Sequence, residues 1–187
     1  VEAKYVEKFD WVETVKDPFG ESQDLTRREF QQTSFRLSVE GPTLEIYDAP
    51  RSISPLLNRL EVFLGLGFSV ASPEIELIKW LHHIDEAIEN VVVNSVGISK
   101  LSLSTQTYAQ VSIRGTEDVR SQVASLIGKR AYKLDKLVVS GVYEELETRF
   151  MLRNDGRATI LKGDENLIPI LRDSLARTLD QQPSVAS

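Results

Sequence analysis

The residue types that most often carry chemistry are sparse in this chain. Its 187 residues include no cysteine and only two histidines, His82 and His83. The missing thiols exclude disulfide bonds, zinc–thiolate sites, iron–sulfur clusters and thiol nucleophiles. His82 and Glu86 are four residues apart, so on a helix they are neighbours that could share a divalent metal. Both fall on the polar side of that helix, where a solvated histidine–carboxylate pair explains them fully, and we predict no metal site.

Motifs for catalysis or cofactor binding are also missing. No phosphate-cradling loop ends in Gly-Lys-Ser or Gly-Lys-Thr, and no serine lies between glycines as a nucleophile elbow requires. Glu144, Glu145 and Glu147 come closest to a carboxylate pair, but they stand at a solvated hairpin entry where nothing separates an acid from a base. We therefore predict no catalytic residue and no cofactor. An enzyme without a familiar motif stays open as an alternative.

Cations gather in the middle of the chain. Residues 96–162 hold 11 Lys and Arg against 7 Asp and Glu, whereas residues 1–95 hold 9 against 17. A basic surface formed by residues 129–162 could contact the phosphates of a nucleic acid. Against this, the net charge is -6, and cations are common at helix C-termini and on exposed sheet faces. The residues of this predicted phosphate-contacting surface are Lys129, Arg130, Lys133, Lys136, Arg149, Arg153, Arg157 and Lys162.

Aromatic residues stand out in the polar N-terminal segment, residues 1–33, which we interpret as an arm. Tyr5, Phe9 and Trp11 lie there among too few apolar neighbours to build a core. Either they dock on the rest of the chain or they bind a partner protein. These three residues are the predicted partner-binding site.

The arm and the segment after it read mainly as strands. Ala3–Trp11 alternates as a strand does, and Asp17-Pro18-Phe19-Gly20 is a turn. Residues 21–33 are polar and indicate a loop or a short helix. Strands are expected from Phe35 and over 44–47, followed by a helix that opens at Ser54-Pro55.

The second half predicts an alternation of helices and strands. A helix is expected to open at Ser72-Pro73-Glu74, with Leu77, Leu81, Ile84 and Ile88 buried and Trp80 half-buried at the side of this stripe. Two β-rich runs follow, and Thr116-Glu117-Asp118 then caps a helix with Val119, Val123, Leu126 and Ile127 inward. A strand over 134–142, a hairpin at Asn154-Asp155-Gly156 and a last helix from Asp164 or Glu165 to about Leu179 complete the chain.

One regularity links parts of the second half. Residues 109–127 align with residues 157–175, with a strand end, an acidic helix start and three apolar helix positions in register. A strand–strand–helix unit cannot cover its own apolar sheet face, whereas two such units side by side can. We therefore predict repeat units at 98–128 and 147–179, while a coincidence of ordinary α+β construction is the alternative.

These patterns combine into one interpretation. The fold class is α+β, an antiparallel-rich sheet built from repeated strand–strand–helix units with helices mainly on one face. We expect an arm (1–33), a main domain (34–179) and a flexible tail (180–187). No apolar run approaches the roughly 20 residues that cross a bilayer, so we expect no membrane partner and a cytoplasmic location. The predicted function is a non-catalytic protein–protein interaction or assembly domain, with a protein partner or homo-oligomer. The alternative is a nucleic-acid-binding module.

Overall fold

A computed structural model describes residues 1–16, 18–39, 44–65 and 70–181. Within these ranges the chain is α+β, with two antiparallel sheets and four helices, so the predicted fold class is confirmed. The strands are divided over two sheets instead of one, because the chain forms two compact units, Val1–Val70 and Ala71–Ser187. Each unit is described by itself.

Unit 1 is built around a long β-hairpin. Strands β1 (Glu2–Lys16) and β2 (Ser22–Leu37) pair antiparallel from Glu2 and Arg36 to Lys16 and Ser22, with no interruption of the register. Strand β3 (Leu44–Tyr47) adds to β2 only at residues 34–37. The prediction of a loop or short helix for 21–33 was therefore wrong. Cross-strand pairing with β1 holds these polar residues extended, and a ribbon with two solvated faces needs no apolar alternation.

A small core lies at the base of this hairpin. Helix α1 (Ser54–Leu64) begins with proline in its first turn, as the sequence predicts, and ends where Gly65 adopts a positive φ of 85°. Leu56 and Leu60 are buried there against Phe35 of β2. Side chains packed on this core from the three strands are Ala3, Tyr5, Leu37, Leu44 and Ile46.

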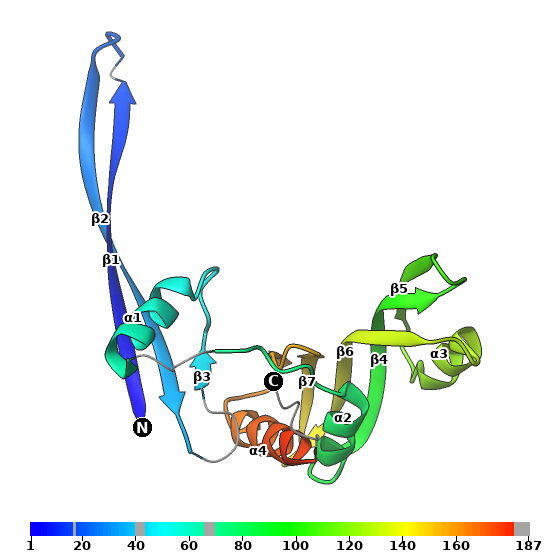
Figure 1. The fold of residues 1–187 in the computed structure, drawn as a ribbon. Coiled ribbons are helices and arrows are strands. Elements are labelled where there is room, and N and C mark those ends of the chain that lie inside the picture. Colours follow the sequence, from blue (N-terminus) through cyan, green and yellow to red (C-terminus); the bar gives the residue numbers. More distant parts are fainter. Residues whose placement is uncertain (17, 40–43, 66–69, 182–187) are drawn as a thin grey trace. The chain divides into compact units, whose positions relative to one another are not determined.

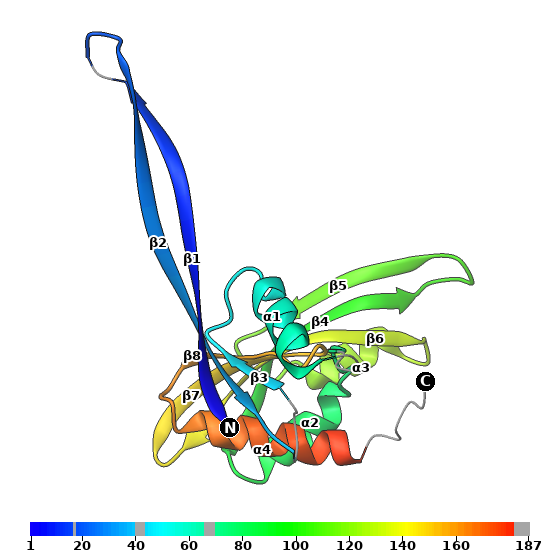
Figure 2. The ribbon, with the colours of Figure 1, turned by 60° about the vertical axis from the view of Figure 1, so that its left-hand side comes forward.

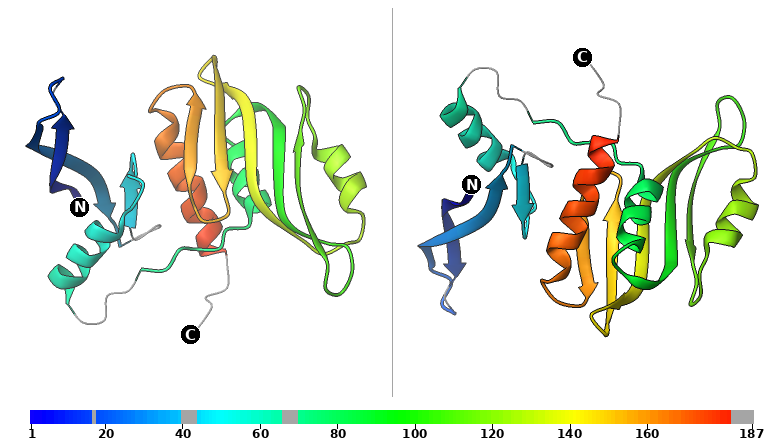
Figure 3. Two further views of the ribbon diagram at one scale, coloured as in Figure 1. Left: turned by 90° about the horizontal axis from the view of Figure 1, so that it is seen from above. Right: turned by 90° about the horizontal axis from the view of Figure 1, so that it is seen from below.

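Unit 2 is a five-stranded antiparallel sheet with helices. Its strands lie in the order β5-β4-β6-β7-β8. Figure 3 shows two of its helices, α4 and α2, side by side against this sheet. The elements in chain order are α2 (Leu77–Asp85), β4 (Glu89–Ser102), β5 (Tyr108–Arg114), α3 (Arg120–Ile127), β6 (Tyr132–Tyr143), β7 (Leu146–Arg153), β8 (Ala158–Lys162) and α4 (Leu167–Asp180). Of the predicted tail, residues 182–187 lie outside the described residues.

The core of unit 2 includes Trp80 at its centre. Trp80 is 1% exposed, and its indole N–H donates to the Leu171 carbonyl (3.2 Å) and the Ser174 hydroxyl (3.0 Å) of α4. The prediction that Trp80 is half-buried was wrong, because α4 packs on the flank of α2 that the helix pattern alone leaves open. The predicted start of this helix at Ser72 was also wrong. The Ile75 amide donates to the Asn154 carbonyl (2.7 Å), which holds this stretch extended until α2 begins at Leu77.

Two glycines in the unit 2 sheet make a matched pair for a stability test. A Cβ atom at Gly141 of β6 would lie 2.5 Å from Ile88 Cγ2 and 2.9 Å from the Glu89 carbonyl oxygen. We expect Gly141→Ala to lower the free energy of unfolding by about 1–3 kcal/mol, because rigid backbone must move. A Cβ at Gly97 meets nothing closer than 3.5 Å, so Gly97→Ala should be neutral or slightly stabilising. Urea denaturation of both variants is the measurement, and equal stabilities would contradict the expectation.

Candidate functional site

Within unit 1, the hairpin extends well past its small core (Figures 1 and 2). Strand β3 pairs no further than Ser34, so residues 8–16 and 22–30 form a ribbon of two strands only. We call these residues the distal ribbon. Nine residues per strand correspond to a length of about 30 Å. Two strands cannot enclose a core, so this part of the hairpin is held by its own cross-strand pairs.

The distal ribbon exposes apolar side chains on both of its faces. Odd-numbered residues continue the face that α1 covers at the base, and even-numbered residues form the opposite face. Phe9 and Trp11 on the odd face are 39% and 41% exposed. On the even face Val12 and Phe30 are 60% and 67% exposed. Exposed apolar residues in such a row are typical of a surface that another protein covers.

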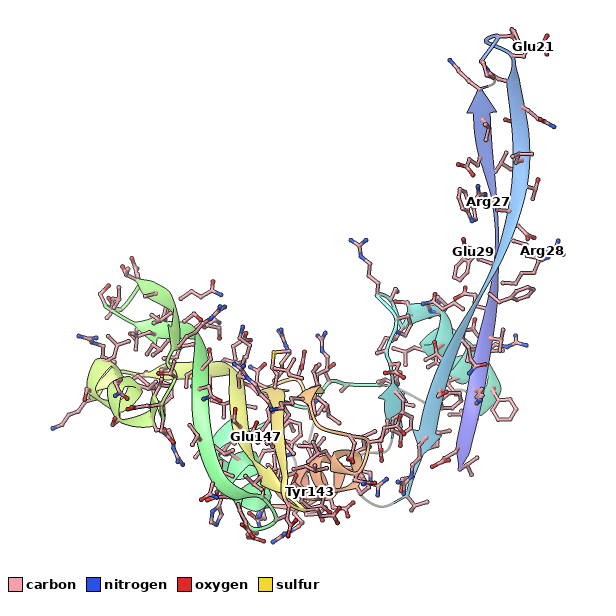
Figure 4. All side chains as sticks on the ribbon, turned by 180° about the vertical axis from the view of Figure 1, so that it is seen from behind. Glu21, Arg27, Arg28, Glu29, Tyr143 and Glu147 are labelled. Carbon is pink, nitrogen blue, oxygen red and sulfur yellow. The ribbon has the colours of Figure 1, made fainter. Side chains whose placement is uncertain are left out.

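Charged side chains between these apolar residues are paired across the two strands. On the odd face Arg27 lies 2.8 Å from the Glu13 carboxylate and stacks over the Trp11 ring at 5.6 Å. On the even face the Asp10 carboxylate lies 2.8 Å from both Lys8 and Arg28. The hydrogen bond from Arg28 is the main reason that the pKa of Asp10 is lowered. Figure 4 shows Arg27 and Arg28 on opposite sides of β2. Such exposed pairs add little stability but favour one register of the ribbon.

The predicted partner-binding residues lie on one face of β1. Tyr5, Phe9 and Trp11 are all odd-numbered residues of this strand. Tyr5 is half-buried against the small core, whereas Phe9 and Trp11 belong to the distal ribbon. The structure adds apolar residues of β2 that the sequence interpretation missed, Leu25 and Phe30. The signal was available: a long strand followed by a tight turn implies a returning strand of similar length.

The eight predicted phosphate-contacting residues do not form one cationic surface. Four are paired with acids: Lys133 with Glu74 (2.6 Å), Arg157 with Asp155 (2.6 Å), Lys162 with Glu147, and Arg153 with Asp135 and Asp155 at 3.9 and 3.8 Å. Lys129 and Arg130 follow α3, where Arg130 donates to the Leu126 carbonyl at the helix end. Alternation along β6 and β7 places Lys136, Arg149 and Arg153 on the sheet face opposite the core residues Leu137 and Phe150.

The pairing of these cations is reflected in their acidic partners. Hydrogen bonds from Lys133 and Lys162 lower the pKa of Glu74 and Glu147. Partial burial tends to raise the pKa of Asp155, but hydrogen bonds from Arg157 outweigh it and the pKa is lowered. The ionised carboxylates therefore neutralise a large share of the predicted basic surface.

The histidine region has a structural explanation. Glu86 accepts a hydrogen bond from Arg177 of α4 (2.7 Å), which is the main cause of its lowered pKa. His82 is exposed, while His83 is buried, 3.7 Å from Glu86 and 3.3 Å from the Gln181 side-chain oxygen. Among the residues that the structure describes, no three His, Cys, Asp or Glu side chains lie close enough to hold a metal ion.

One shallow depression lies in unit 1, and comparisons with other proteins add no homology. The depression is lined by residues that include Tyr5, Thr33, Pro50 and Leu56, and its enclosed space is about that of one water molecule. No family model, no curated protein and no solved structure matches the chain. Over the described ranges, no helix combines the length and apolar character needed to cross a membrane.

Proposed function

We propose that this protein is a non-catalytic interaction or assembly domain whose binding element is the distal ribbon. The observation that carries the proposal is a long two-stranded ribbon with exposed apolar side chains on both faces. A hairpin without a third strand or a covering helix is marginally stable alone, whereas contact with another protein buries its apolar residues. Tyrosine, tryptophan and phenylalanine are also the residues that most often anchor protein interfaces.

The proposal is tested by the mass of the native particle. One chain has a mass of 21.1 kDa. Native mass spectrometry of the protein as isolated from its own cells is expected to give a larger particle, either a multiple of this mass or a complex with another protein. A particle of one chain at micromolar concentration would count against an assembly role.

We also propose that unit 2 is built from two strand–strand–helix units, 98–128 and 147–179. The order of elements supports this, because β4, β5 and α3 are followed, after β6, by β7, β8 and α4. The apolar residues of α3 and α4 enter the same core, which fits helices that cover one common sheet face. In this arrangement unit 2 is a scaffold that needs no ligand to complete its core.

A second candidate function is binding of single-stranded nucleic acid by the outer sheet face of unit 2. The observation that favours it is the register: Lys136 lies opposite Arg153, and Arg149 is on the same face. Arg114 of β5 joins them, because Ser95 of β4 pairs with both Arg114 and Val138. Cations spaced over neighbouring strands could follow a chain of phosphates.

This second candidate predicts a difference between two double alanine variants. Lys136→Ala with Arg149→Ala should reduce the slope of log affinity against log salt by about 2, or one unit per lost phosphate contact. Arg157→Ala with Lys162→Ala is the control and should change the slope little, because acids already hold these two cations. Fluorescence anisotropy with a labelled single-stranded oligonucleotide measures the slopes. Absence of binding at low salt ends this candidate.

A further inference from the structure

The outer edge of β1 is the best-defined unused feature of the distal ribbon. Strand β1 is the first strand of the sheet and pairs only with β2, so its other edge has no neighbouring strand in the described parts of the chain. This edge runs over all 15 residues of β1 without a bulge. Natural proteins usually cover or interrupt such an edge, because it can pair with another strand.

The groups that this edge offers follow from the pairing of β1 with β2. Val1 and Leu37 exchange both backbone hydrogen bonds, at 2.7 and 2.8 Å. In an antiparallel ladder hydrogen-bonded and non-hydrogen-bonded pairs alternate. Odd-numbered residues of β1 therefore direct their N–H and C=O groups to β2, and the even-numbered residues from Glu2 to Lys16 direct theirs outward. The free edge is a regular row of donors and acceptors.

We propose that β1 pairs antiparallel with β1 of a second copy of this chain, about a two-fold axis through Phe9. This inference rests on the proposed function and names the partner of the same ribbon. Phe9 is the middle residue of a strand that runs from Glu2 to Lys16, so all of β1 takes part. The result is a four-stranded antiparallel sheet, β2-β1 of one copy continued by β1-β2 of the other.

Side chains along β1 are complementary to themselves in this register. Lys8 lies opposite the partner's Asp10, and Glu2 lies opposite the partner's Lys16, each twice by symmetry. Val6 lies opposite the partner's Val12, again twice. No two like charges are opposed, because the remaining charged residues face uncharged ones. Opposite charges and β-branched pairs are the cross-strand pairs that stabilise antiparallel sheets.

The neighbouring registers lack this complementarity. Two-fold pairing that keeps each face on its own side moves the axis by whole residues along β1. An axis at residue 8 opposes Lys8 to its own copy, and an axis at residue 10 opposes Asp10 to its copy and Glu7 to the partner's Glu13. An axis at Trp11 leaves residues 2–5 unpaired and opposes no opposite charges. Charge alone thus selects the register centred on Phe9.

The axis at Phe9 also suits the apolar side chains. Phe9 and its copy form a non-hydrogen-bonded pair, the kind in which side chains approach most closely, and two aromatic rings gain from this contact. Because the axis is perpendicular to the sheet, both odd faces stay on the same side. Val15 then lies beside the partner's Ala3, which packs on the small core of that copy. Apolar residues of one tip are thereby covered at the base of the other.

Cysteine cross-linking tests the register in a chain that has no cysteine of its own. Phe9→Cys is expected to form a covalent dimer under mild oxidation, because facing residues of a non-hydrogen-bonded pair meet the geometry of a disulfide. Glu7→Cys with Trp11→Cys should give the same dimer and retains Phe9. The control is Glu13→Cys on the same face, whose copy lies eight residues away, about 27 Å. Non-reducing gels should show at least about tenfold more dimer for the first two variants than for the control.

A charge exchange provides an independent test of the antiparallel register. Glu2→Lys opposes two lysines and should weaken dimerisation about tenfold, as measured by sedimentation, and the added Lys16→Glu should restore it. Within one chain these residues are 14 positions apart, about 46 Å, so only pairing between copies explains the rescue.

The outcomes separate this inference from the proposed function. Equal cross-linking of Phe9→Cys and Glu13→Cys, or no rescue by the double exchange, overturns the β1 pairing. If the native particle then contains a different protein, the ribbon still serves assembly and only the identity of the partner was wrong. A single-chain native particle together with no cross-linking overturns both proposals.

Discussion

A chain in which Asn-Gly replaces residues 8–30 is expected to lose all assembly while both of its units stay folded. Glu7 and Gln31 are paired in the hairpin, so a two-residue turn between them closes the strands in their natural register. The small core remains, because Phe35, Leu56 and Leu60 lie outside the deletion. The variant removes the exposed aromatic and β-branched side chains together with the free edge. An interface centred on these anchors has no substitute elsewhere in the proposed arrangement.

Sedimentation velocity of the shortened and full chains is the measurement for this prediction. A matched control removes apolar surface elsewhere: Val62→Ser with Phe63→Ser on α1, where the two side chains are 74% and 83% exposed. The control should assemble as the full chain does. An assembly that survives the deletion but is lost in the control would transfer the binding surface from the ribbon to α1.

Trp80→Ala is expected to lower the free energy of unfolding of unit 2 by about 3–5 kcal/mol. The indole is 1% exposed and joins α2 to α4 through packing and its two hydrogen-bond acceptors. Removing it leaves a cavity between these helices and the sheet. Trp80→Phe retains most of the volume and loses only the N–H, so its cost should be smaller, about 1–2 kcal/mol.

Guanidinium denaturation followed by circular dichroism measures both substitutions. Trp11→Ala is the control, since this residue is 41% exposed on the distal ribbon, and it should leave the unfolding of unit 2 unchanged. A loss below about 1 kcal/mol for Trp80→Ala would be incompatible with the packing of α4 on α2.

Local sequence signals predicted the elements that are fixed locally. The hairpin at Asn154-Asp155-Gly156 connects β7 to β8, with Gly156 at a φ of 81° that glycine adopts without strain. In α3, Val119, Val123 and Ile127 proved buried as predicted. Leu126 is 42% exposed, because a helix of eight residues buries only a narrow stripe.

Elements fixed by distant contacts escaped the sequence interpretation. Residues 22–30 are a strand only because β1 lies beside them, and their composition reads as a loop. The burial of Trp80 depends on α4, about 90 positions later in the chain. The distribution of charge was similarly deceptive: the cations of 129–162 cluster in the sequence, yet acids such as Asp155 and Glu147 pair with several of them in space.

The candidate site was half predicted. Phe9 and Trp11 were recognisable as aromatics in a polar segment, which is a local property. Their place in a two-stranded ribbon with a free edge is a property of the sheet order, and it turns an ambiguous aromatic cluster into a defined surface.

Amide hydrogen exchange along the distal ribbon, in the protein as isolated from its own cells, tests the central claim most directly. An uncovered two-stranded ribbon frays and exchanges as fast as an open loop, whereas a ribbon held by another protein exchanges slowly. We predict slow exchange at residues 8–16 and 22–30, comparable to that of β4 in the unit 2 sheet, and faster exchange on dilution. Fast exchange along the whole distal ribbon at every concentration, while β4 stays protected, would contradict the claim that another chain covers it.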